Sequence, residues 1–213
     1  MGSPYAQIEK QAGSRRLAAS LLWLTIGWNV IEGVIAVSAG VVAASVALVG
    51  FGFDSFIEVT AAGILLWRLG LPDHDEAVER REAMAHRVVG VTFLILAAYI
   101  AAQVAYTVAG GNEPEASGVG LVLAAVSLVV MPVLGLVKRS NARHLGSRAL
   151  IAESTETLIC SYLSLTLFIG LGANAAFGWW WADIVAALAM APWIVKEGLE
   201  GLRGEACEAD EEG

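Results

Sequence analysis

Long apolar stretches alternate with short polar ones along most of the chain. A helix needs about 20 apolar residues to cross the hydrocarbon core of a bilayer, and six stretches approach that length. They cover residues 17–38, 43–67, 87–109, 118–137, 149–172 and 178–196. Segments of turn-forming or charged residues separate them, such as Gly-Gly-Asn-Glu-Pro-Glu at 110–115. The pattern therefore predicts an all-α polytopic membrane protein with six transmembrane helices.

The 13 lysine and arginine residues are all found near every other connection between these stretches. They occur before the first stretch, around the junctions that follow the second and fourth, and from the end of the sixth onward. Cytoplasmic loops carry the excess of Lys and Arg, so both termini are expected in the cytoplasm, with residues 138–148 forming a basic loop. We expect three parts: an N-terminal cytoplasmic segment (1–16), a six-helix transmembrane transporter domain (17–200) and an acidic cytoplasmic tail (201–213).

Composition supports a membrane protein and excludes several other classes. Charged residues make up only 16% of the chain, against about 25% in soluble domains. With a net charge of −8 the chain has no basic surface for nucleic acid. The two cysteines, Cys160 and Cys207, form no disulfide framework. No nucleophile–base set and no phosphate-binding glycine loop is apparent, so we expect neither an enzyme, including an intramembrane hydrolase, nor an ATP-driven pump, and no tightly bound cofactor.

Acidic residues inside the apolar stretches are the main chemical signal. A charged residue at the bilayer centre costs at least about 2.5–3.5 kcal/mol on insertion scales, and no lysine or arginine is expected at comparable depth. Such carboxylates must be protonated, face water or bind a cation. Five lie deep in the stretches and a sixth lies nearer an inner end: Glu32, Asp54, Glu58, Glu156 and Asp183, and Glu153.

Spacing and depth bring four side chains to one level near mid-membrane. Asp54 and Glu58 are four residues apart and share a helix face, and the same holds for Glu156 and Cys160. Three oxygens and one sulfur from two facing helices would form a tetrahedral zinc site. Carboxylates alone would suit manganese equally, and iron or cobalt remain open, but a thiolate favours zinc. Taken alone, Cys160 could equally be a small apolar core residue.

Two of these motifs resemble the cation diffusion facilitator family. The second span of that family typically reads Ser-x-Ala-Leu-x-Ala-Asp-x-x-His-x-x-x-Asp. Residues 45–58 read Ser-Val-Ala-Leu-Val-Gly-Phe-Gly-Phe-Asp-Ser-Phe-Ile-Glu, which puts Asp54 and Glu58 on the two ligand positions. The family's fifth span follows a Leu-Gly-Ser-x-Ala-Leu stretch, as at 145–150, and then places His and Asp where this chain has Glu156 and Cys160. Residues 181–188 are similar to the family's Ala-Asp-x-x-x-Ala-Leu pattern.

The resemblance implies a function and further candidate residues. It implies binding of zinc or a related divalent cation between spans 2 and 5, efflux in exchange for protons, and a homodimer. Glu153 is a further candidate metal ligand. The chain would be a short, divergent member that lacks the family's C-terminal cytoplasmic domain. We expect it to be an integral protein of a bacterial inner membrane. Glu32 and Asp183 could handle protons, and Glu32 could equally form hydrogen bonds with the neighbours of Asn29 at the outer end of its helix. His74 and Asp75 could form a second metal site, although a solvated charged loop explains them equally.

A second interpretation stays open on the sequence alone. The chain could be a membrane metal-binding or regulatory protein that does not transport.

The acidic tail with Cys207 is expected to be a disordered, solubilising segment.

Overall fold

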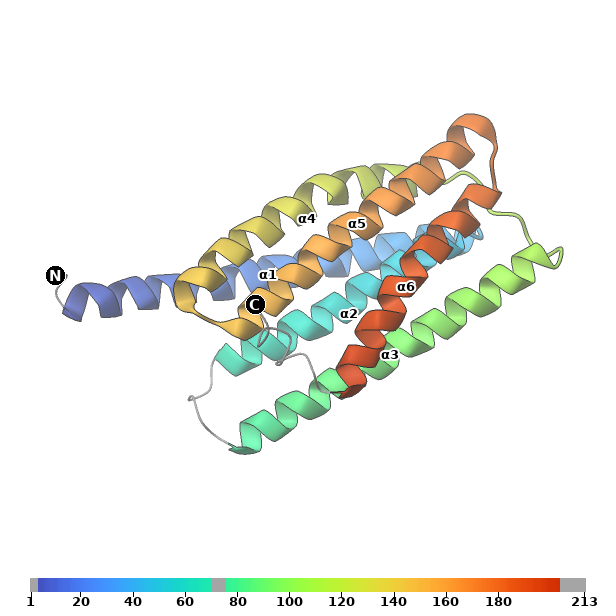
Figure 1. Ribbon diagram of the computed structural model, residues 1–213. Helices are drawn as coiled ribbons and strands as arrows, with labels where there is room; N and C mark the ends of the chain where they lie inside the picture. The colour runs from blue at the N-terminus through green and yellow to red at the C-terminus, as the bar shows by residue number, and fades with distance from the viewer. Residues whose placement is uncertain (1–3, 70–75, 204–213) are drawn as a thin grey trace.

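The computed structural model describes residues 4–69 and 76–203, and this part of the chain is entirely helical apart from short connections. The six helices are α1 (Pro4–Val42), α2 (Val46–Leu69), α3 (Glu76–Val108), α4 (Gly118–Leu145), α5 (Arg148–Phe177) and α6 (Trp181–Arg203). They form one elongated bundle (Figure 1). The all-α, six-helix architecture predicted from the hydrophobic pattern is confirmed.

Five of the helices have the length and apolar composition of membrane spans. These spans are 13–42, 46–69, 87–108, 118–145 and 149–177. In the described residues α6 does not meet the same measure, because Asp183 lies in its first turn and Lys196, Glu197 and Glu200 lie near its end. It packs mainly on α3 and also on α5 and α2. Asp183 is buried and Glu197 lines a pocket inside the bundle, whereas Lys196 is exposed and Glu200 is partly exposed.

The α4–α5 connection is much shorter than the predicted basic loop at 138–148. Helix α4 continues to Leu145, and Gly146 ends it in the left-handed conformation (φ 63°) with its N–H donating to Ala142 and Arg143 carbonyls. Ser147 then caps the first turn of α5 by accepting a hydrogen bond from the Leu150 N–H. The loop prediction for most of 138–148 is wrong, because polar residues in the last turns of a long helix break the apolar pattern without breaking the helix.

Helix α2 lies at the centre of the bundle and contacts α1, α3, α5 and α6. Gly52 allows a close approach to α1: a Cβ at this position would lie 2.8 Å from the backbone nitrogen of Val37. Small residues let membrane helices pack in this way. Helices α3 and α6 meet similarly, since a Cβ on Gly90 would lie 2.8 Å from the carbonyl oxygen of Gly198.

The α1–α2, α3–α4 and α5–α6 connections gather at one end of the bundle, and the end of α4 and the start of α5 lie at the other (Figure 1). Hydrogen bonds tie the first set together. The Glu115 N–H donates to the Ala43 carbonyl at 2.8 Å, and the Asn174 amide donates to the Pro114 carbonyl at 3.0 Å. The distribution of basic residues predicts the same grouping of connections at the two ends. Which end faces the cytoplasm stays a prediction.

Candidate metal centre

A small pocket lies between α2, α3, α5 and α6. It encloses a cavity of about 30 Å³, which has room for an ion or one or two water molecules but not for an organic substrate. The lining is acidic and apolar: Asp54, Ile57, Glu58, Ala61, Val89, Phe93, Glu156, Ile159, Cys160, Trp193 and Glu197. The four side chains that the sequence places at one level, Asp54, Glu58, Glu156 and Cys160, are thus brought together.

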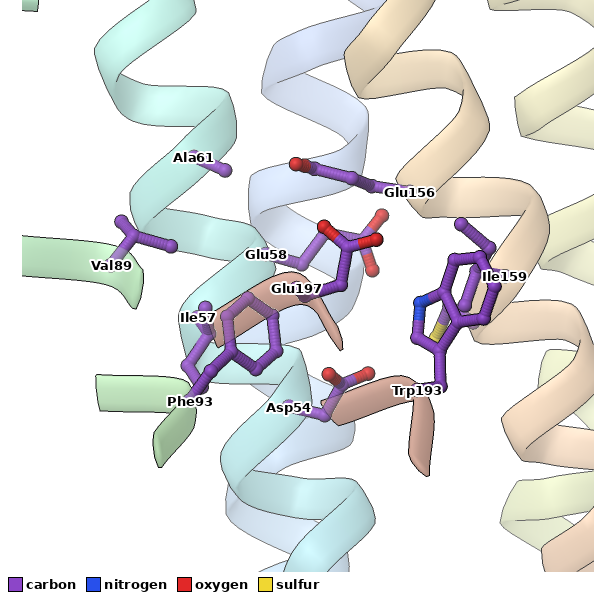
Figure 2. A pocket seen from close by; sticks show the side chains of 11 residues that line it. Asp54, Ile57, Glu58, Ala61, Val89, Phe93, Glu156, Ile159, Trp193 and Glu197 are labelled. Atoms are coloured by element: carbon purple, nitrogen blue, oxygen red, sulfur yellow. The ribbon is translucent and has the colours of Figure 1, made fainter. Parts of the chain in front are cut away.

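Four carboxylates from three helices dominate this pocket. Figure 2 shows Asp54 and Glu58 of α2, Glu156 of α5 and Glu197 of α6 around a shared space. Asp54 and Glu58 are buried, whereas Glu156 and Glu197 are half-buried. Within the described residues no lysine, arginine or histidine lines the pocket. Several carboxylates inside a membrane bundle are costly as bare anions, so we expect bound cations or protons to neutralise them.

The ligand atoms do not yet converge on a single point. Among the described residues, no three His, Cys, Asp or Glu side chains lie close enough together to hold a metal ion as the structure stands. Cys160 is buried and its thiol is free. Coordination of an ion by this set therefore requires side-chain rotation or closer approach of α2, α5 and α6.

Sequence reasoning missed Glu197 and Trp193. The apolar stretch predicted for the sixth span ends at residue 196, one residue before Glu197. Glu197 belongs to α6, which continues to Arg203, and it lies one helical turn after Trp193 on the same face. That i, i+4 relation was a signal available in the sequence, but which helix this face meets was not.

Glu153 lies outside the pocket lining and has a partner of its own. Lys138 of α4 donates to its Oε1 at 2.5 Å, and both side chains are buried. Lys138, which was expected in the basic loop, belongs instead to α4 and reaches Glu153 on α5. An ion pair with Lys138 makes Glu153 a poorer candidate ligand than the four pocket carboxylates.

Glu32 links three helices away from the pocket. Its carboxylate accepts hydrogen bonds from Ser55 of α2 at 3.1 Å and from Ser127 of α4. The side chain is fully buried. A proton-handling role for Glu32 stays a prediction, and its hydrogen bonds give it a structural role between α1, α2 and α4.

Asp183 caps a neighbouring helix. It accepts hydrogen bonds from the Ser45 hydroxyl at 2.5 Å and from the backbone N–H groups of Val46 and Ala47 at 2.9 and 3.3 Å. The Ser45 hydroxyl also accepts from the Leu48 N–H at 3.1 Å. Three of the unpaired N–H groups in the first turn of α2 are satisfied in this way. Proton handling by Asp183 stays a prediction.

The predicted second metal site cannot be placed. His74 and Asp75 lie outside the described residues, as does the acidic tail with Cys207.

Comparison with known protein families decides the assignment of the chain. A family described as the cation efflux transmembrane domain matches residues 22–204, which include all six helices in whole or in part. The chain belongs to the cation efflux family. This agrees with the resemblance carried by the motifs on the second, fifth and sixth spans, and the fold is that of a membrane domain.

A curated relative matches most of this chain. Transmembrane protein 163 of Xenopus laevis is 26% identical over 157 residues, which is 73% of this chain. The chain spans about half the length of this relative, 55%. Because the relative is a frog protein, it gives no support to a bacterial inner membrane, which stays a prediction.

Proposed function

We propose that this cation efflux protein transports a divalent metal cation, with zinc as the preferred ion, through the pocket between α2, α5 and α6. One observation carries the proposal: four carboxylates from three helices surround a cavity of ionic size, and no basic side chain among the described residues lines it. A divalent cation would offset part of this negative charge. Hard oxygen donors bind many such ions, and the Cys160 sulfur would favour zinc.

Transport would be coupled to protons. Carboxylates in the membrane interior are costly as bare anions, so in the absence of metal they would hold protons. Metal binding requires deprotonated ligands and therefore releases protons. Antiport of protons against metal follows if the pocket opens alternately to the two sides, with Asp54 and Glu58 as the central ligands and Glu156, Glu197 and Cys160 completing the set.

Flux through the purified protein tests this proposal. The full chain is reconstituted into proteoliposomes that contain a zinc-sensitive dye and a pH-sensitive dye, and a pH gradient is imposed. Zinc entry with opposite proton movement is expected, and Asp54→Asn and Glu58→Gln should abolish both. No metal-dependent proton movement with zinc, manganese, iron or cobalt would overturn the transport proposal.

The second candidate is a membrane metal-binding or regulatory protein without transport. The candidate ligand atoms of the described residues are too far apart to hold an ion together. This separation favours the second candidate only if α2, α5 and α6 cannot move closer to one another. Calorimetry distinguishes the two: zinc binding that is lost in Asp54→Asn, in a wild-type protein without flux, would establish the binding role. A homodimer is the assembly expected of the family, and light scattering in detergent would measure it.

A further inference from the structure

A buried lysine on α4 is connected to the pocket through a threonine. Lys138, with 2% of its side chain exposed, donates to Glu153 Oε1 at 2.5 Å and to Thr157 Oγ1 at 2.8 Å. Thr157 is fully buried on α5. Its Oγ1 also lies 2.8 Å from Glu58 Oε1, so one hydroxyl touches both the lysine and a proposed metal ligand.

The chemistry of the three groups fixes the direction of these hydrogen bonds. A charged ammonium group can only donate, so the Thr157 hydroxyl accepts from Lys138. Its single proton is then free for Glu58 Oε1 at 2.8 Å or for the Glu153 carbonyl at 3.2 Å. The shorter contact is to Glu58, which must be deprotonated to bind a metal ion, and hydrogen bonds to charged acceptors are the stronger ones. The chain therefore runs from Lys138 through Thr157 to Glu58.

This contact holds one oxygen of Glu58 and leaves the other free. Oε2 of Glu58 is buried and has no hydrogen-bond partner among the described residues. Buried carboxylate oxygens normally have a partner, and Glu58 lines the cavity. An oxygen fixed by Thr157 on one side, with its twin unpaired at a cavity of ionic size, is the arrangement expected of a metal ligand held in place by its neighbours.

We propose that Thr157 is a positioning residue for Glu58, and that Lys138 acts through it by holding the hydroxyl in the orientation that donates to Glu58. Glu153 supplies the counter-charge that lets Lys138 remain buried between α4 and α5. The inference rests on the proposed function of the pocket as a metal site. A merely structural role, in which Lys138 and Glu153 join α4 to α5, would leave metal affinity independent of Thr157.

Thr157→Val removes the hydroxyl at nearly constant volume, and Thr157→Ser retains it as the matched control. Loss of a group that orients a metal ligand typically weakens affinity by about 10–100-fold. We expect the KM for zinc in the proteoliposome assay, and the Kd from calorimetry, to rise at least about tenfold in Thr157→Val, with kcat little changed. Thr157→Ser should stay close to wild type.

A double-mutant cycle tests the part played by the lysine. Lys138→Met with Glu153→Leu removes both charges together, so that neither is left buried without its partner. This double variant should raise the zinc Kd in the Thr157 background and have little further effect in the Thr157→Val background, because both changes act on the same contact.

The outcomes separate this inference from the proposed function. Equal zinc Kd values for wild type and Thr157→Val would overturn the inference while leaving the metal site intact. If the effects of Thr157→Val and of the double variant on the zinc Kd were additive, the proposed role of Lys138 would be overturned. A wild-type protein without zinc binding or flux would instead overturn the proposed function, whatever the variants do.

Discussion

Glu197 adds a third helix to a site that motif matching places on two. Its carboxylate lines the pocket from α6, together with those of α2 and α5. We expect Glu197→Gln to raise the KM for zinc at least about tenfold, since it removes one negative charge from the ligand set without changing its shape.

Glu200→Gln is the matched control for Glu197→Gln. Glu200 lies on the same helix and pairs with the exposed Lys196 at 3.4 Å, and exposed ion pairs contribute little. Equal zinc KM values for the two variants would show that Glu197 is not part of the site.

Cys160 is the pocket residue that we expect to set the ion preference. Replacing its sulfur with oxygen leaves a set of hard donors that suits manganese as well as zinc. In Cys160→Ser we expect the ratio of zinc to manganese kcat/KM to fall about tenfold, which corresponds to about 1.4 kcal/mol of lost preference. Cys207→Ser, in the tail, serves as the control. An unchanged ratio in Cys160→Ser would make Cys160 a core residue that only lines the cavity.

At the scale of helices, the start of α2 depends on α6. Asp183 accepts hydrogen bonds from the first N–H groups of α2, and a lost cap or charged hydrogen bond costs about 1–3 kcal/mol. Asp183→Ala should lower the thermal midpoint in detergent, with a smaller loss in Asp183→Asn. Glu113→Ala, which alters an exposed acid near the same end, should leave the midpoint unchanged. A normal midpoint with lost proton movement in Asp183→Asn would instead support proton handling.

The contact between α3 and α6 sets where Glu197 lies. A Cβ on Gly90 would meet the backbone of α6 at 2.8 Å, at both the Gly198 oxygen and the Leu202 nitrogen. Gly90→Ala must therefore move the helices apart, at a cost of about 1–3 kcal/mol for overpacking, and displace Trp193 and Glu197 from the pocket.

Gly90→Ala should lose zinc flux and have a lower thermal midpoint. Gly63→Ala is the control, because a Cβ there meets no atom within 4 Å. Flux at the wild-type level in Gly90→Ala would show that the α3–α6 contact does not hold the site together.

For the whole molecule, the two ends of the bundle should lie on opposite sides of the membrane. Cysteines placed at exposed positions of a chain lacking Cys160 and Cys207 can measure this. An impermeant maleimide applied to intact cells should label Asn112→Cys, near the α3–α4 connection, and should reach His144→Cys, at the end of α4, only after permeabilisation. The reverse pattern would invert the orientation drawn from the basic residues.

Much of the architecture was predictable from the sequence, because the bilayer imposes strong local rules. A span must be helical to satisfy its backbone and needs about 20 apolar residues, so six apolar stretches predicted six helices. The ends were less predictable. Helix α4 continues through Lys138 and Asn141 to Leu145, since a helix does not stop where its surroundings become polar.

The candidate site was predicted where it depends on spacing along one helix. Asp54 with Glu58, and Glu156 with Cys160, share faces because they are four residues apart, and the apolar lengths set their common depth. These local relations are contained in the sequence by itself. Together with the motif resemblance, they selected the four side chains that the pocket brings together.

Only the tertiary structure decided which faces meet. It brought Glu197 to the pocket, paired Lys138 with Glu153, and placed Asp183 on the first turn of α2. Each of these contacts joins residues on different helices, and close approaches at positions such as Gly52 and Gly90 set how those helices cross. The periodicity of one helix does not tell how that helix is rotated relative to its neighbours. The contacts between residues on different helices are therefore determined only by how the helices pack.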